Sequence, residues 1–475
     1  MIGSQFLHSR KVVCFIYILA MFMASLDGTI VYVALPTIGE DLGVSSADLS
    51  GVTVWYLVGV AAILPIAGWL GDRFGSKKIF LSALSLFTIA SIICGLVQTV
   101  GLLNIARFIQ GLGGGMLAPI GMAMIFRTFS VEERPKVSRS LVLPIAIAPA
   151  LGPVVGGLIL EILSWQWIFF INVPIGVIAI VIGMFYLTEQ QVESVGKMDW
   201  KGFVLIVIGY PLLMFSLTQG SSRGWTSIEI LSSAICGLLL VSVFILHAIN
   251  KEKPIMNVKL LSESTFRKVS ILSFFAVGGL QSLLFIFPIM YQQAVGATAL
   301  ESGIVVFIEA IGLMLASRII PISLKKLGVY RVILFGFLGA CICFIIMSIV
   351  GPFANPWVLR ILLFTIGLTL GHSVIAMQYT TFTNITSENM SKATTLFNVQ
   401  NRLGAAIGIS MIASLLIVLQ DGAESIMNPI PYQISIFVAA LFLAISFILT
   451  FKNRHIIKRS DKQSNRDTIK GEKAG

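Results

Sequence analysis

Apolar stretches of about 20 residues, separated by short polar segments, recur along nearly the whole chain. A helix of that length spans the hydrocarbon core of a bilayer, where backbone groups must be hydrogen-bonded within the protein. The strict apolar and polar alternation of membrane β-barrel strands is absent from the sequence. The pattern therefore predicts an all-α, polytopic membrane protein. It places fourteen transmembrane helices near 13–35, 49–70, 79–98, 102–125, 138–160, 166–187, 202–218, 229–249, 269–291, 302–323, 331–351, 357–380, 393–419 and 432–451.

Composition excludes a water-soluble globule. Hydrophobic residues make up 56% of the 475 positions and charged residues 12%, whereas soluble domains carry about 25% charged residues. The first apolar stretch contains Asp27 and has no cleavage site of small residues after it, which predicts a retained helix and not a removed signal peptide. All five cysteines lie in apolar segments without metal-ligand spacing, so neither disulfides nor a metal site nor another cofactor is expected.

The net charge of +11 reflects membrane topology. Lys and Arg lie in short loops between apolar spans and in the tail, and not on one patch that nucleic acid would bind. Basic residues are retained on the cytoplasmic side of a membrane, and they recur after every second predicted helix, as at Arg73, Lys77 and Arg127. The pattern predicts an even number of crossings with both termini in the cytoplasm. The polar tail beyond Phe451 is expected to be disordered.

A basic loop joins the second and third predicted helices: Gly68-Trp-Leu-Gly-Asp-Arg-Phe-Gly-Ser-Lys-Lys78. Asp72 can cap or pair with a helix end, Gly75 permits a tight turn, and Arg73 and Lys77 anchor the loop at the interface. The segment resembles the signature loop of the major facilitator superfamily, from which Gly71 and Ser76 depart. The alternative interpretation is an ordinary basic turn.

The fourth predicted helix carries Arg107, Gln110 and Gly111, followed by the glycines 113 to 115. This resembles the superfamily motif with a buried arginine, which is linked to proton transfer in antiporter members. An arginine within the membrane is costly and normally faces a cavity or a partner, so Arg107 is a functional candidate. No strand precedes the glycines, which favours close helix packing over a phosphate-binding loop.

The fifth predicted helix contains Gly152-Pro153-Val-Val-Gly156-Gly157, which resembles the antiporter motif Gly-Pro-x-x-Gly-Gly. Pro153 frees a backbone carbonyl and the glycines allow close approach, so the helix can kink and act as a hinge. A purely structural kink is the alternative. The resemblance implies export.

The first predicted helix contains Leu26-Asp27-Gly-Thr-Ile-Val-Tyr-Val-Ala-Leu-Pro36. It resembles the motif of the fourteen-helix drug:proton antiporters of the EmrB/QacA type, with Tyr32 in place of the usual Asn. Desolvation favours the protonated form of an intramembrane carboxylate, so Asp27 is a candidate proton carrier, or else a structural hydrogen-bond partner. This branch implies the division into an N-terminal segment, a six-helix bundle, two inserted helices, a second six-helix bundle and a cytoplasmic tail: 1–12, 13–187, 202–249, 269–451 and 452–475.

In the second half the candidates rest on intramembrane polar groups. Glu309 lies near mid-membrane and can bind a proton or a cationic substrate, whereas Arg318 is expected on the opposite face of the same helix. His372 can titrate near neutrality or serve in packing. Asn398 and Arg402, one turn apart, are candidates for a cavity wall or for helix packing.

These observations predict a proton-coupled exporter of small amphipathic or cationic drugs that works by alternating access, as a monomer in the plasma or inner membrane. Its partners are the lipid bilayer, the small-molecule substrate and protons. One alternative is a narrow-specificity metabolite or organic-anion transporter that uses Arg107 and Arg402. Another is a membrane receptor or scaffold without transport. An ATP-driven pump is disfavoured because no phosphate-binding loop is present, and no paired nucleophile and base indicate an enzyme.

Overall fold

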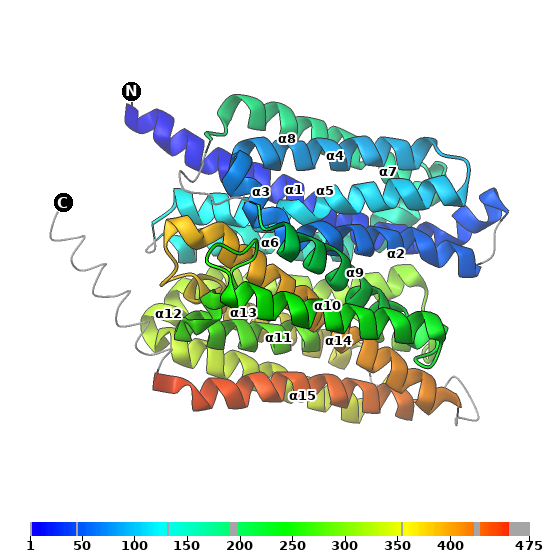
Figure 1. Ribbon diagram of the computed structural model, residues 1–475. Helices are drawn as coiled ribbons and strands as arrows, with labels where there is room; N and C mark the ends of the chain where they lie inside the picture. Colours follow the sequence, from blue (N-terminus) through cyan, green and yellow to red (C-terminus); the bar gives the residue numbers. More distant parts are fainter. Residues whose placement is uncertain are drawn as a thin grey trace. The chain divides into compact units, whose positions relative to one another are not determined.

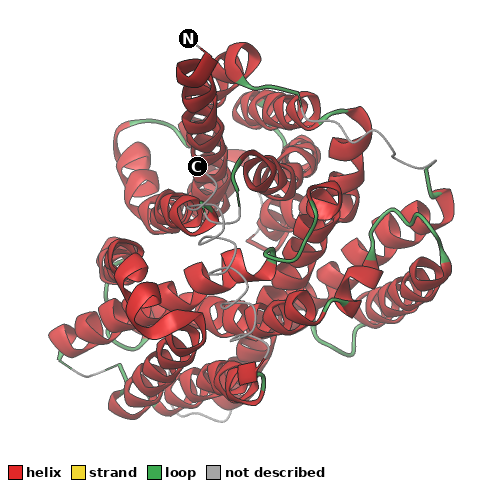
Figure 2. Ribbon diagram, turned by 90° about the vertical axis from the view of Figure 1, so that its left-hand side faces the viewer, coloured by secondary structure: helices red, strands yellow, loops and turns green. Residues whose placement is uncertain are grey.

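The computed structural model describes residues 2–43, 46–130, 133–189, 198–352, 355–421 and 428–455. Every regular element in this part of the chain is a helix, as Figure 2 shows, which confirms the all-α prediction. The elements are α1 (Ile2–Leu42), α2 (Ser46–Ile63), η1 (Leu64–Ile66), α3 (Ala67–Phe74), α4 (Ser76–Leu96), α5 (Val100–Thr128), α6 (Arg134–Ile162), α7 (Trp167–Phe170), α8 (Asn172–Tyr186), α9 (Trp200–Arg223), α10 (Ile228–Asn250), η2 (Val258–Ser262), α11 (Ser264–Gln293), α12 (Ala299–Val350), α13 (Pro356–Thr381), η3 (Ser387–Asn389), α14 (Met390–Asp421) and α15 (Ile430–Lys452).

Twelve helical stretches in the described residues are long and apolar enough to cross a membrane. One of them, Glu301–Val350, has 50 residues, and a continuous helix of that length measures about 75 Å against a hydrocarbon core of about 30 Å. Its helix α12 is interrupted at Gly328, where φ is 73° and ψ is 161°. The predicted helices 302–323 and 331–351 therefore lie on either side of a backbone break. The 29-residue helix α6 is not among the twelve stretches.

The ends of the chain differ in how far the structure describes them. The predicted N-terminal segment 1–12 is not separate from the first helix: its described residues, 2–12, are helical and belong to α1, which begins at Ile2. Most of the predicted tail 452–475 lies outside the described residues, which end at His455.

The chain forms two compact units. The first comprises residues 1–129, 148–259 and 386–399, and the second comprises 130–147, 260–385 and 400–475. Helices α6 and α14 contribute residues to both units. The predicted division into two six-helix bundles with an inserted pair remains a prediction.

Glycines bring three helices of the first unit into backbone contact. A Cβ atom on Gly111 of α5 would lie 2.2 Å from the carbonyl oxygen of Tyr56 in α2, and one on Gly59 of α2 would lie 2.3 Å from that of Phe108 in α5. On another face of α5, a Cβ on Gly113 would lie 2.8 Å from the carbonyl oxygen of Ala83 in α4, which runs beside α5 in Figure 1. Larger side chains would force these helices apart, because helix interfaces in membranes depend on such close approach.

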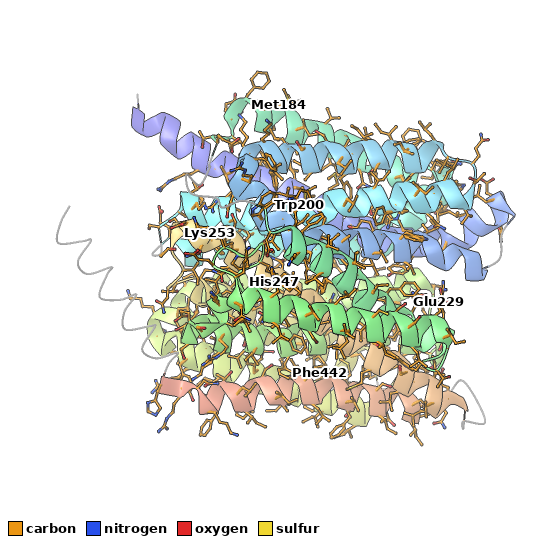
Figure 3. The ribbon with its side chains drawn as sticks, viewed as in Figure 1. Met184, Trp200, Glu229, His247, Lys253 and Phe442 are labelled. Carbon is orange, nitrogen blue, oxygen red and sulfur yellow. The ribbon has the colours of Figure 1, made fainter. Side chains whose placement is uncertain are left out.

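Helices α9 and α10 form a hairpin that is fastened at both ends. Asp199 caps the start of α9 and accepts a hydrogen bond at 2.8 Å from Nε2 of His247, in the last turn of α10. At the other end Arg223 and Glu229 form an ion pair of 2.8 Å. Figure 3 shows Glu229 and His247 at opposite ends of α10. Most of the outer face of α10 is apolar and exposed, as expected of a helix that faces lipid.

In the second unit, α12 and α13 cross at a row of glycines. A Cβ on Gly367 of α13 would lie 1.9 Å from the carbonyl oxygen of Glu309, and one on Gly312 of α12 would lie 2.0 Å from that of Phe364. Around this crossing, aromatic side chains that include Phe287, Phe337 and Tyr432 form a buried core. The close backbones place Glu309 at the crossing of the two helices.

Candidate functional site

A buried ion pair joins α1 and α5 in the first unit. Oδ2 of Asp27 lies 2.6 Å from Nη1 of Arg107, and the two side chains are 0% and 1% exposed. Burial of two charges carries a desolvation cost that is repaid only if the geometry is good and the remaining polar atoms are hydrogen-bonded. The surroundings of the pair therefore decide what it can do.

Two amides complete the coordination of the Asp27 carboxylate. Oδ1 accepts hydrogen bonds at 2.9 Å from Nε2 of Gln110 and at 2.9 Å from Nδ2 of Asn172. Gln110 follows Arg107 by one helical turn in α5, whereas Asn172 is the first residue of α8. Gln110 also donates to Ser91 of α4 at 2.8 Å. The carboxylate thus connects four helices, α1, α4, α5 and α8, directly or through Gln110.

Arg107 is held on its other sides by α2 and by a ring from α7. Its Nε donates to the carbonyl oxygen of Val52 at 3.1 Å. Its guanidinium lies 4.3 Å from the ring centre of Tyr56 and 5.7 Å from that of Phe169. Aromatic faces stabilise a cation most where water is excluded. The guanidinium is therefore compensated by a carboxylate, a carbonyl and two aromatic rings.

The structure brings together three of the residues singled out from the sequence, Asp27, Arg107 and Gln110. Asn172, Ser91 and Tyr56 were missed. Asn172 had a detectable signal, because it is an amide inside the apolar run that follows Gln166 in the stretch predicted near 166–187. Ser91 and Tyr56 had none, since Ser and Tyr are common in membrane helices and their position depends on which helices pack together.

The loop before α4 holds a second ion pair. Asp72, at the end of α3, lies 2.7 Å from Nη2 of Arg127, near the end of α5, and both side chains are largely buried. Arg127 also donates to Ser76 at 3.3 Å and to the carbonyl oxygen of Ser387 at 2.9 Å. Oδ2 of Asp72 is buried without a hydrogen-bond partner among the described residues. Arg127 thus connects this loop to the segment that precedes α14.

The remaining residues of this loop have distinct positions. A Cβ on Gly68 would lie 2.5 Å from the carbonyl oxygen of Ser391, so this glycine permits contact with the first turn of α14. Gly75 adopts a φ of 98°, which favours glycine. Nζ of Lys77 donates a hydrogen bond to the carbonyl oxygen of Met184 in α8 at 2.8 Å. The side chain of Arg73 is exposed.

The glycines of α6 face α1. A Cβ on Gly152 would lie 2.1 Å from Oγ1 of Thr29, and one on Gly156 would lie 3.0 Å from Cγ1 of Ile30. Gly157 has open space at its Cβ position. The side chain of Pro153 lies outside the described residues. Two of the three glycines therefore set the distance between α6 and the turn of α1 that follows Asp27.

Glu309 is the main candidate in the second unit. Its side chain is buried, with 6% of the residue exposed, and no described residue pairs with its carboxylate. Arg318 is exposed on another face of α12, as the nine-residue spacing predicted. His372 contacts α12 at Ser323, fourteen residues beyond Glu309 and about 21 Å along the helix. Glu309 and His372 are therefore not partners.

Both ring nitrogens of His372 have partners. Nδ1 lies 2.7 Å from the carbonyl oxygen of Leu368 and Nε2 lies 3.2 Å from Oγ of Ser323. This arrangement suits a neutral ring that donates from Nδ1 and accepts at Nε2. Arg402 is exposed, and the described residues provide no ion pair for it. No three His, Cys, Asp or Glu residues of the described ranges are grouped as metal ligands.

Comparison with known proteins identifies the family. The model of the Major Facilitator Superfamily matches residues 17–409. A protein of Escherichia fergusonii named "Putative multidrug resistance protein MdtD" is 30% identical over 395 residues, which cover 83% of this chain and 84% of that protein. Its namesake in Citrobacter koseri is 29% identical over the same lengths.

Solved structures share the fold. The human organic anion transporter MFSD10 (TETRAN) matches with a TM-score of 0.67 and 13% identity, covering 93% of this chain and 99% of that one. The proton:xylose symporter XylE matches with a TM-score of 0.66 and 13% identity, covering 94% and 96%. The chain therefore belongs to the major facilitator superfamily: it is a multi-pass membrane transporter and not an enzyme.

Proposed function

We propose that this transporter is a proton-coupled exporter of small amphipathic or cationic molecules, of the fourteen-helix drug:proton antiporter branch. The observation that carries the proposal is the buried contact between Asp27 and Arg107. A carboxylate and an arginine sealed among membrane helices are costly and mark proton or substrate pathways. The names of the bacterial relatives support drugs as substrates.

Protonation of Asp27 links proton binding to helix packing. The carboxylate is the shared acceptor of Arg107 on α5, Gln110 on α5 and Asn172 on α8. A proton on Asp27 removes its charge, so Arg107 loses its main compensation and α1 loses its strongest attachment to α5. In an alternating-access cycle this change favours rearrangement of the helices around Asp27.

Glu309 is the second acidic group of the proposed mechanism. Because its carboxylate is buried and has no cationic partner among the described residues, it can receive a proton or a cationic substrate. We propose that substrate and proton compete for these two acidic groups on alternate sides of the membrane. His372 is a weaker candidate, because both of its ring nitrogens have partners.

The helices described above support the proposed fourteen crossings. The 50-residue stretch Glu301–Val350 is long enough for two crossings and is interrupted at Gly328. Helix α6, with 29 residues, is long enough for one more. Counting α12 twice and adding α6 brings the twelve stretches to fourteen. An even number of crossings leaves both termini on one side, and the proposal places them in the cytoplasm of a cell with the protein in its plasma or inner membrane. Monomeric function is part of the proposal.

The glycine motifs and the basic loop are proposed to act in the conformational change. Gly152 and Gly156 keep α6 against the turn of α1 that directly follows Asp27. A movement of α1 at Asp27 would therefore shift this contact. Asp72 and Arg127 connect the ends of α3 and α5 to the segment before α14. Both arrangements can differ between two conformations, because packed interfaces switch between discrete states.

A narrow-specificity carrier of organic anions is less well supported. It would need an arginine available to the anion, but Arg107 is compensated by Asp27 and two aromatic rings. Arg402 is exposed and has no carboxylate partner in the described chain, so it is the residue on which this alternative depends.

Efflux of ethidium from cells that express the protein tests the proposal. Wild-type cells should export ethidium, a protonophore should stop the export, and Asp27→Asn should reduce it at least tenfold at equal membrane abundance. Asp41→Asn is the matched control, because Asp41 lies on the same helix but accepts its hydrogen bond from Nε1 of Trp165 at 2.7 Å, and not from the partners of Asp27. Export that continues in the presence of the protonophore would refute proton coupling. Absence of ethidium export, with the protein abundant in the membrane, would favour a narrow-specificity carrier or a scaffold without transport.

A further inference from the structure

Asn172 is buried but only partly hydrogen-bonded. It is 0% exposed, and its Nδ2 donates to Oδ1 of Asp27 at 2.9 Å. Its own Oδ1 is buried and has no hydrogen-bond partner among the described residues. Buried side-chain oxygens are nearly always paired, because leaving one unpaired costs more than a hydrogen bond gains. An unpaired oxygen next to a titratable carboxylate therefore calls for an explanation.

Gln110 cannot exchange its two amide atoms. Its Oε1 accepts from Nη1 of Arg107 at 2.5 Å and from Sγ of Cys94 at 3.8 Å, while its Nε2 donates to Asp27 and Ser91. Turning this amide by half a turn would place its N–H groups against the N–H of Arg107. Gln110 is therefore a permanent donor to Asp27.

Asn172 has no such restriction. A half turn about its Cβ–Cγ bond exchanges Nδ2 with Oδ1, and the described residues offer the present Oδ1 no bond that would be lost. With Asp27 charged, Nδ2 must face the carboxylate, because an oxygen there would be repelled. With Asp27 neutral, Oδ1 can accept from the O–H that the carboxylic acid now carries.

We propose that Asn172 is a positioning residue that recognises both protonation states of Asp27 by turning its amide. It donates to the carboxylate and accepts from the carboxylic acid. The inference rests on the proposed role of Asp27 as a proton carrier. The proton comes from water on one side of the membrane, resides on Oδ1 of Asp27 and leaves to water on the other side, and no other covalent bond changes.

The other titratable groups around the pair do not provide this acceptor. Arg107 can only donate, and the S–H of Cys94 is directed to Gln110. The groups that interact electrostatically with Asp27 or Arg107 come from α1, α2, α4 and α5: Tyr32, Tyr56, Cys94, and Asp27 and Arg107 themselves. Gln110 and Asn172 each donate an amide N–H to Asp27. Of their two amide oxygens, only that of Asn172 has no hydrogen-bond partner among the described residues.

The test uses infrared difference spectroscopy on the full chain in liposomes, between acidic and alkaline buffer. Asp27→Asn identifies the carboxylic C=O band of Asp27 by its loss. Leucine has nearly the same shape as asparagine but cannot accept a hydrogen bond. In Asn172→Leu the C=O band of Asp27 should therefore move to higher frequency. Thr88→Ala removes a buried hydroxyl of α4 that donates to the carbonyl oxygen of Leu84 at 2.8 Å and not to Gln110, so it should leave the band in place.

Transport supplies the second measurement. Asn172→Leu should lower proton-driven ethidium efflux about tenfold, the loss that corresponds to one buried hydrogen bond. Exchange of ethidium for ethidium without a proton gradient should remain close to wild type, because that half of the cycle needs no protonated Asp27. A residue with a merely structural role would lower both rates together.

The outcomes separate this inference from the proposed function. If wild type has no Asp27 band at any pH, Asp27 is not a proton carrier, and its proposed role and the role of Asn172 both fail. If the band is present but unmoved in Asn172→Leu, only the role of Asn172 fails. If Asn172→Leu does not fold, the wild-type protein labelled with side-chain ¹³C-asparagine supplies the test. An asparagine C=O band should change with pH in wild type and stay constant in Asp27→Asn. A band that stays constant in wild type would overturn the proposal.

Discussion

The carboxylate of Glu189 lies directly over Gly75 at the turn between α3 and α4. Its Oε1 accepts from the backbone N–H of Lys77 at 3.0 Å and its Oε2 from that of Lys78 at 3.3 Å. A Cβ on Gly75 would lie 2.5 Å from the carboxylate carbon. Glu189, which follows α8, therefore caps the first turn of α4, and it can do so only because residue 75 has no side chain.

Gly75→Ala should destabilise the protein by more than backbone strain alone. Alanine at a φ of 98° costs about 1–2 kcal/mol, and its methyl group would also displace the Glu189 cap, which is worth about 0.5–2 kcal/mol. Gly224→Ala is the control, because Gly224 has a φ of 86° with open space at its Cβ position. Thermal unfolding in detergent compares the two. An equal loss in both variants would mean that the contact with Glu189 is unimportant.

The ion pair between Asp72 and Arg127 should be strongly coupled. Removing one partner leaves a buried charge, so Arg127→Leu alone is expected to cost about 3–5 kcal/mol. Asp72→Asn combined with Arg127→Leu removes both charges, and the double variant should be more stable than the sum of the single losses predicts. A double-mutant cycle on unfolding measures this coupling. Additive losses would show that the two charges do not stabilise each other.

The sequence predicted the membrane-spanning helices because burial in lipid leaves a strong local signal: a long run without charges. It also singled out Asp27, Arg107 and Gln110, which the structure brings together, since charges and amides inside such runs are rare. The contact of Glu189 with the turn at Gly75 was not predictable, because it joins segments more than 100 residues apart and a glutamate in a loop carries no signal of its own. Packing of α8 against α4 decides it. The contact of His372 with Ser323 was not predictable either, because it depends on how α12 and α13 pack together.

Gly152 and Gly157 of α6 have different surroundings and should respond differently to substitution. Gly152→Ala would place a methyl group 2.1 Å from Oγ1 of Thr29, so α6 and α1 must separate or Thr29 must turn. Such overpacking typically costs about 1–3 kcal/mol, and we expect ethidium efflux to fall with it. Gly157→Ala meets open space and should leave stability and efflux near wild type. Equal efflux in both variants would contradict a role of the contact between α6 and α1 in transport.

Glu309 and Glu301, on the same helix, should differ in their effect on transport. Glu309→Gln removes a buried carboxyl and should lower ethidium efflux at least tenfold, since an amide can neither bind a proton nor pair with a cation as the carboxylate does. Glu301→Gln affects an exposed residue that completes a capping box with Thr298, so it should change efflux little. Exchange without a proton gradient then assigns the role of Glu309. If Glu309→Gln loses exchange as well as efflux, the carboxyl contacts the substrate. If exchange survives, the carboxyl carries protons, and if efflux also survives, Asp27 alone must couple the two flows.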